Sequence, residues 1–219
     1  KNRVRKKIDF QERELEIWTQ IVEKMNVVIT EDGLISQFDG FQDLAELDLE
    51  AYREKYDNIH RMDRILKAEG DSPDRYQVIK QADTLMCFYL LAPGQVARIL
   101  ERMGYSPGDP SELMKKNYDY YIHRTSHGST LSFVVHAAIL QYLEGHRDDQ
   151  MSWYRIALES DLFDIQGGTT PEGIHTGVMG GTLDLVIEAF VGIDFYRDHI
   201  EVHPCQIGRA SCRERVCHR

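Results

Sequence analysis

The sequence predicts an all-α fold of antiparallel helical hairpins, and three observations support this class. Apolar residues recur at spacings of three and four along most of the chain, the period of a helix with one buried face. Polar or glycine-bearing turns divide the chain into segments of about 10 to 18 residues, a length typical of short packed helices. Strand-like sequence is limited to two short runs, LISQF at 34–38 and IEVHP at 200–204.

The first predicted helices lie in the N-terminal quarter of the chain. An amphipathic helix is predicted over 10–25, because its apolar residues fall on one face. Those residues are Leu15, Trp18, Ile21, Val22 and Met25. A polar turn at 30–33 separates this helix from the LISQF run, and 44–56 is predicted to form the next helix.

A long helix is predicted to start at Ser72 and to continue to Leu91. Serine is a favoured N-cap and Pro73 suits the first helical position. The Pro93-Gly94 pair then interrupts the helical pattern. The remaining helices are predicted over 95–103, 111–122, 131–143, 150–159 and 177–191.

Charge and hydropathy exclude several classes of partner. The formal net charge is −10, so the phosphates of a nucleic acid or an acidic membrane surface would repel the protein. No run approaches the roughly 18 apolar residues of a membrane span, and no signal-type apolar stretch follows the basic start KNRVRKKIDF. The sequence therefore predicts a cytoplasmic protein with no nucleic-acid or membrane partner.

The last fifteen residues differ in composition from the rest. Residues 205–219, CQIGRASCRERVCHR, contain three of the four cysteines and four arginines. The cysteine spacing does not match common zinc sites, so no metal site is predicted. The stretch QIGRASCRERV instead resembles the translated read of a sequencing adaptor. We therefore assign 1–204 to the domain and 205–219 to a non-native tail.

Two segments rich in hydrogen-bond donors each precede an apolar helix. RTSHGSTLS at 124–132 contains His127, Ser129 and Thr130 but no carboxylate, and the glycine-rich segment QGGTTPEGIHTG occupies 166–177. Glycines allow a ligand to approach the backbone, and helix N-termini favour anions. These segments suit a phosphate or a sugar, although each could also be an ordinary helix connection.

The third candidate is the pair Lys80-Gln81, placed mid-helix by the predicted 72–91 helix. Its flanks, VIKQADTLMCFYLL, are so apolar that this helix is expected to be interior. A buried lysine needs an anion or several hydrogen-bond acceptors, and sugar hydroxyls would serve. The alternative is a solvated helix face. Among the other polar residues, His136 is interpreted as an ordinary helix histidine, and Asp161 and Asp164 either cap helices or orient the glycine-rich segment.

Together these segments resemble the conserved blocks of the glycoside hydrolase family 65 phosphorylases, which include maltose, trehalose, kojibiose and nigerose phosphorylases. The blocks are KQADTLM, YYIHRTSHGSTLS and QGGTTPEGIHTGVMGGTLDLV, with FDGFQDL and RMDRILKAEGDSPDRY before them. The resemblance covers residues 8–204, in order. It implies the C-terminal portion of an (α/α)6 barrel, truncated at both ends, whose enzyme cleaves an α-glucosidic bond with phosphate and releases β-glucose 1-phosphate.

The resemblance also implies roles for individual residues. Lys80 and Gln81 would contact the glucosyl unit. Phosphate would be bound by His127, Ser129 and Thr130, and less certainly by Gly168 and Thr169. No cofactor is implied beyond inorganic phosphate as co-substrate, and the full-length protein could form a homodimer.

The chemistry of phosphorolysis accounts for the absence of a carboxylate from 124–132. An inverting hydrolase needs a general acid and a general base. Phosphate is already an anion and needs donors that hold it in line instead. Glu172 could act as a base in a related hydrolase of the trehalase or kojibiose-hydrolase type, which remains the alternative. The general acid implied by the resemblance is a glutamate upstream of this chain, so we expect residues 1–219 to be inactive alone.

Overall fold

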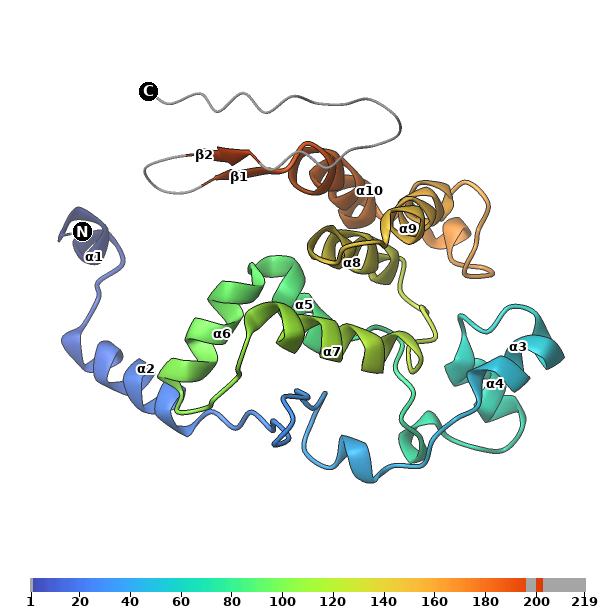
Figure 1. Ribbon diagram of the computed structural model, residues 1–219, viewed down its shortest axis with the longest axis horizontal. Coiled ribbons are helices and arrows are strands. Elements are labelled where there is room, and N and C mark those ends of the chain that lie inside the picture. The colour runs from blue at the N-terminus through green and yellow to red at the C-terminus, as the bar shows by residue number, and fades with distance from the viewer. Residues whose placement is uncertain (1, 196–199, 203–219) are drawn as a thin grey trace.

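The computed structural model is helical, with one small hairpin of strands, and describes residues 2–195 and 200–202 (Figure 1). The all-α prediction is confirmed. The helices are α1 (Asn2–Lys7), α2 (Glu12–Lys24), α3 (Leu49–Tyr56), α4 (Met62–Ala68), α5 (Asp83–Leu90), α6 (Pro93–Arg102), α7 (Pro110–Ile122), α8 (Leu131–Ile139), α9 (Arg147–Glu159) and α10 (Thr176–Asp184).

Helix α8 lies at the centre of the packing. All its residues from Ser132 to Ile139 are buried, because they face α5 on one side and α9 and α10 on the other. One apolar core joins α5, α6, α7 and α8, and a second joins α8, α9 and α10. A third, smaller core lies at α3 and α4, which form a separate lobe in Figure 1.

Several predicted helices match the observed ones closely. The helices predicted over 10–25, 95–103, 111–122 and 150–159 correspond to α2, α6, α7 and α9. The predicted 131–143 helix is observed as α8 followed by a 3-10 turn at Leu140–Tyr142. The predicted 177–191 helix continues from α10 into a π-helical turn at Leu185–Phe190.

The predicted helix over 72–91 is wrong in its first half. Ser72 caps only a 3-10 turn at Pro73–Arg75, and α5 begins at Asp83. Between them the chain runs alongside two other segments, with bridges from Tyr76 to Ala45 and from Ile79 to Thr125. These long-range hydrogen bonds satisfy the backbone that a helix would otherwise pair internally.

The two predicted strands had different outcomes. Strand β2 (Ile200–Val202) pairs antiparallel with β1 (Ile193–Phe195), which confirms the strand within IEVHP. LISQF is not a strand, because only a single bridge joins Ile35 to Ile29.

The predicted tail, 205–219, lies outside the described residues. No helix in the described part of the chain is long and apolar enough to cross a membrane.

Asn117 of α7 holds the irregular segment at 33–35 against the helical core. Its carboxamide oxygen accepts from the N–H of Ile35 at 2.9 Å. Its nitrogen donates to the carbonyl of Gly33 at 3.1 Å and to that of Leu113 at 2.8 Å. The Asn117 side chain is fully buried, so its backbone partners would have no water to bond to if the carboxamide were removed.

We expect Asn117→Ala to lower the free energy of unfolding by about 2–3 kcal/mol, because a buried N–H loses its acceptor and a small cavity remains. Chemical denaturation would measure the change. Lys115→Ala on the same helix is the control, since its ion pair with Asp119 is exposed to solvent. Equal effects of the two substitutions would contradict the role given to Asn117.

Candidate functional site

The segment before α5 is fixed against the segment before α8 by backbone hydrogen bonds. The N–H of Ile79 donates to the carbonyl of Arg124 at 2.9 Å, and the N–H of Ser126 donates to the carbonyl of Ile79 at 2.8 Å. This pairing carries Lys80 to Gly128: a Cβ at Gly128 would lie 2.9 Å from Cγ of Lys80. Two of the predicted motifs are therefore in direct contact.

Lys80 and Gln81 do not lie mid-helix, and the predicted interior lysine is wrong. Lys80 is exposed and Gln81 is half-buried, just before the start of α5. The amide nitrogen of Gln81 donates to the carboxylate of Asp83 at 3.0 Å. The apolar flanks reflect the burial of neighbouring residues, Ile79 and Ala82, whereas Lys80 lies on a bend between them and is exposed.

His127 has an unusual backbone conformation and is almost completely buried. Its φ is +54°, in the left-handed region that non-glycine residues rarely adopt. The ring packs among aromatic side chains, with centroids 4.7 Å from Trp153, 4.8 Å from His136 and 5.9 Å from Phe133. Such a strained residue persists only where its surroundings fix it, and these positions cluster at functional sites.

The His127 imidazole is neutral near pH 7. Burial among these rings lowers its pKa well below the ordinary value, and the neighbouring His136 and His60 lower it further. Its Nδ1 lies 2.9 Å from Oγ of Ser132. The ring can therefore offer a hydrogen bond to a ligand without carrying a positive charge.

Ser129 and Thr130 occupy the turn that leads into α8. Thr130 is buried and Ser129 is half-buried. The first N–H groups of a helix have no partner within the helix, so this turn suits an anion or a hydroxyl. Only Gly128 separates these predicted phosphate-binding residues from His127 in the chain, and their role in binding remains a prediction.

The glycine-rich segment is organised by two aspartates. The carboxylate of Asp164 accepts from the N–H groups of Gly168 at 2.6 Å, Thr169 at 2.9 Å and Thr170 at 3.1 Å. Of the two readings of Asp164, a helix cap or a residue that orients this segment, the structure supports the second. The backbone N–H groups of Gly168 and Thr169 are consequently occupied, so in this conformation they do not face a phosphate.

Asp161 fixes His175 in the same way. One carboxylate oxygen of Asp161 lies 2.6 Å from Nδ1 of His175, and the other accepts from its backbone N–H at 2.8 Å. This pairing places Nδ1 toward Asp161 and leaves Nε2 on the opposite side of the ring. Sequence reasoning did not select His175, although an aspartate-histidine pair is a common way to orient an imidazole.

Gln166 joins the glycine-rich segment to the start of α8. Its buried amide nitrogen donates to the carbonyl of His127 at 3.0 Å. The three segments selected from the sequence therefore meet: Lys80 contacts Gly128, and Gln166 binds the residue before it. Glu172 is not part of these contacts. It is exposed on a 3-10 turn at Thr170–Glu172.

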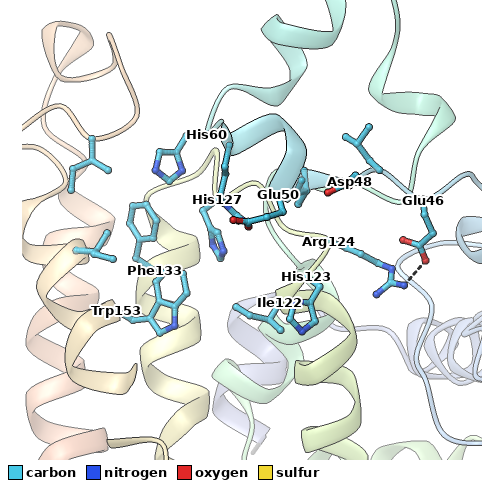
Figure 2. Close-up of a pocket in the computed structure, with 15 residues that line it drawn as sticks. Glu46, Asp48, Glu50, His60, Ile122, His123, Arg124, His127, Phe133 and Trp153 are labelled. Atoms are coloured by element: carbon cyan, nitrogen blue, oxygen red, sulfur yellow. Dashed lines mark hydrogen bonds and ion pairs between the residues drawn. The ribbon is translucent and has the colours of Figure 1, made fainter. Parts of the chain in front are cut away.

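A pocket of about 700 Å³ opens beside His127 (Figure 2). Figure 2 shows His60, Phe133 and Trp153 on one side of it, with Glu46 and Arg124 on the other. Of the predicted site residues only His127 lines this pocket. The ring of His127 thus reaches the pocket, while the backbone beside it contacts Lys80.

The charged groups around the pocket are largely paired with one another. Arg124 forms an ion pair with Glu46 and stacks over the ring of Tyr120, 3.7 Å from its centroid. Arg53 pairs with Glu50 at 3.0 Å.

His60 lies over the His127 side of the pocket, with Nδ1 3.0 Å from the carbonyl of Ser126, and burial lowers its pKa. Sequence reasoning missed His60 because its partner lies 66 residues away.

No group of three or more histidine, cysteine, aspartate or glutamate residues within 2–195 and 200–202 is arranged to hold a metal ion.

Comparison with known proteins identifies relatives across most of the chain. The model of the glycosyl hydrolase family 65 central catalytic domain matches residues 1–184. An uncharacterized glycosyl hydrolase of Mycobacterium tuberculosis is 44% identical over 198 residues, which cover 90% of this chain and 14% of the relative. Trehalose 6-phosphate phosphorylase of Lactococcus lactis is 42% identical over 203 residues, covering 90% of this chain and 26% of the relative.

A more distant relative and a solved structure belong to the same group of proteins by their descriptions. Kojibiose phosphorylase of Halothermothrix orenii is 31% identical over 202 residues, covering 90% of this chain and 23% of the relative. A solved structure described as "Putative kojibiose phosphorylase from human microbiome" is 25% identical with a TM-score of 0.65, and the match covers 93% of this chain and 26% of that one. The likeness supports the predicted helical-barrel fold class. The chain spans only 14% to 26% of the length of these relatives.

Gly128→Ala is expected to destabilise the site by about 1–3 kcal/mol, because overpacking forces the backbone to move. The added Cβ would overlap the carbonyl oxygen of His60 and press on Lys80. Gly180→Ala in α10 is the matched control: no atom lies within 4 Å of its added Cβ, and alanine favours a helix. Thermal unfolding would compare them, and equal stability of the two variants would contradict the close approach at Gly128.

Asp164→Asn is expected to loosen the glycine-rich segment. The N–H donors of Thr170, Gly168 and Thr169 hold the pKa of Asp164 below its ordinary value of 3.8. Its contribution is therefore present above the pKa of a free aspartate and is lost as pH falls through the lower folded pKa. Hydrogen exchange at residues 168–170 should be several-fold faster in the variant at pH 7, whereas Asp39→Asn, an exposed carboxylate elsewhere, should leave it unchanged. Unaltered exchange in Asp164→Asn would contradict the assignment.

Proposed function

The chain belongs to glycosyl hydrolase family 65, and we propose that it forms part of the catalytic domain of an inverting disaccharide phosphorylase. The enzyme would cleave an α-glucosidic bond with inorganic phosphate and release β-glucose 1-phosphate. The substrate would be an α-linked glucose disaccharide of the maltose, trehalose, kojibiose or nigerose type. The relative at 42% identity is named for trehalose 6-phosphate, so a 6-phosphorylated disaccharide belongs in the same substrate class.

The meeting of the three motif segments is the observation that carries this proposal. Lys80 lies against Gly128, and Gln166 binds the carbonyl of His127. A sugar held at Lys80 and Gln81 would consequently lie next to the donors at the start of α8. Holding the nucleophile beside the anomeric carbon supplies much of the rate of such a reaction.

The charges at this place favour phosphate over an activated water. The segment 124–132 contains no carboxylate, and the carboxylate of Asp164 is occupied by three backbone N–H groups. Glu172, the base considered for the hydrolytic alternative, is exposed on the 3-10 turn at Thr170–Glu172. We therefore assign phosphate binding to His127, Ser129 and Thr130, and a contact at Thr169 to its hydroxyl.

The general acid is proposed to lie outside residues 1–219. An inverting phosphorolysis still needs a proton for the leaving oxygen, and the carboxylates found near His127 are paired with donors. The chain also spans about a quarter or less of its relatives. We expect residues 1–219 alone to have no activity, and phosphate-dependent formation of glucose 1-phosphate by this chain would refute that expectation.

The proposed reaction can be tested with the full-length enzyme that contains this chain. A panel of α-linked glucobioses and their 6-phosphates would be assayed with and without phosphate, and we expect glucose 1-phosphate only when phosphate is present. Lys80→Ala should lower kcat/KM about 100-fold, as expected for loss of a charged contact in the transition state. Lys67→Ala, an exposed lysine of α4, is the matched control. Release of free glucose without phosphate would support the hydrolase instead.

A further inference from the structure

Ser132 lies between two buried histidines on the first turn of α8. Its Oγ is 2.9 Å from Nδ1 of His127 and 3.4 Å from Nδ1 of His136. All three side chains are buried, and Ser132 and His136 are completely inaccessible to water. The direction of each hydrogen bond in this group can be worked out from what each atom is able to donate or accept.

His136 carries its proton on Nδ1. That nitrogen lies 2.7 Å from the backbone carbonyl oxygen of Ser132, and a carbonyl oxygen can only accept. A neutral imidazole protonated on Nδ1 has no proton on Nε2. In agreement, Nε2 of His136 is buried and has no hydrogen-bond partner among the described residues.

Among the described residues, the hydroxyl proton of Ser132 then has Nδ1 of His127 as its acceptor. Nδ1 of His136 is already protonated and can only donate toward Oγ. Nδ1 of His127 is the nearer of the two nitrogens to Oγ of Ser132. If it accepts, His136 donates to Ser132 and Ser132 donates to His127. The neutral His127 ring consequently carries its own proton on Nε2.

We propose that Ser132, held by His136, is a positioning residue that fixes the Nε2–H tautomer of His127 and so presents a neutral N–H donor to an oxyanion of the phosphate co-substrate. The part concerning phosphate rests on the proposed function; the tautomer does not. The ligand atom recognised is a hydrogen-bond acceptor, because a protonated ring nitrogen can only donate, and the proposed function makes that acceptor a phosphate oxygen.

The burial of the group explains why the ring donates without being charged. Burial lowers the pKa of His136 to about 4, and it lowers that of His127 well below its ordinary value. An uncharged imidazole has one donor nitrogen and one acceptor nitrogen, and the hydrogen bond at one decides the other. Without Ser132, the acceptor could face the phosphate and repel it.

The unpartnered Nε2 of His136 is a further sign that this arrangement serves a purpose. A buried nitrogen without a hydrogen-bond partner destabilises a protein. A leucine at position 136 would avoid that cost, but it has no N–H to donate to Ser132, as Nδ1 of His136 does. The ring of His136 also packs against His127 and Trp153, with centroids 4.8 Å and 5.3 Å away.

The tautomer can be read directly from the full-length enzyme labelled with ¹⁵N-histidine. Solid-state NMR distinguishes protonated from unprotonated ring nitrogens, and His127→Gln would identify the signals of His127 by their loss. We expect a protonated Nε2 and an unprotonated, hydrogen-bonded Nδ1 at pH 7. A His127 protonated on Nδ1, or on both nitrogens, would overturn the proposal.

Kinetics would test the role in phosphate binding. Ser132→Ala should raise KM for phosphate about three- to tenfold, the effect of one neutral hydrogen bond, with KM for the sugar unchanged. Ser132→Thr keeps the hydroxyl and should restore the wild-type KM. Thr182→Val is the control, because it removes a buried hydroxyl that bonds only the carbonyl of Met179.

A double-mutant cycle separates positioning from simple packing. The amide nitrogen of glutamine can donate without help from Ser132, so adding Ser132→Ala to His127→Gln should leave KM for phosphate unchanged. Additive effects would contradict the proposal. A protonated Nε2 in an enzyme that does not need phosphate would instead refute the proposed function and leave the tautomer assignment standing.

Discussion

The backbone hydrogen bonds between the segment before α5 and the segment before α8 decide where the candidate site lies. Ile79 donates to the carbonyl of Arg124 and accepts from the N–H of Ser126, so the two segments run side by side just before α5 and α8 begin. Lys80 follows directly and meets Gly128, where the absence of a side chain permits the contact. Without this pairing the lysine and the donors of 124–132 would belong to separate surfaces.

The same pairing marks the limit of what the sequence could predict about the fold. Helices α6, α7 and α9 are set by local signals, namely apolar periodicity and a proline or acidic residue in the first turn, and these were found at nearly the right positions. The helix expected over 72–91 has equally good local signals at Ser72 and Pro73. It fails because Ala45 and Arg124 offer its backbone partners from distant parts of the chain, and no local pattern reports such partners.

The candidate site divides in the same manner. The motif at 124–132 was selected because a donor-rich turn before an apolar helix is visible in sequence, and the structure brings it against Lys80 and Gln166. His136 was interpreted as an ordinary helix histidine, and its Nδ1 does bind the carbonyl of Ser132 on the same helix. The sequence did not show that its ring packs on His127. The spacing of Ser132 and His136 by four residues was the available signal, since such pairs share a helix face. His60 offered no comparable signal, because its contact with Ser126 depends on tertiary packing.

The distribution of charge links the fold to the proposed chemistry. Carboxylates are not absent from this region: Asp161, Asp164 and Glu46 all lie near it, but each is bound by donors of the protein itself. Asp164 uses its charge to fold the glycine-rich segment, and Asp161 uses its charge to orient His175. Because these charges are compensated locally, they oppose an incoming anion less than free carboxylates would. The buried histidines contribute donors without adding charge. Under the proposed function, such a site would bind phosphate through oriented N–H and O–H groups, and its selectivity would depend on which atoms carry the protons.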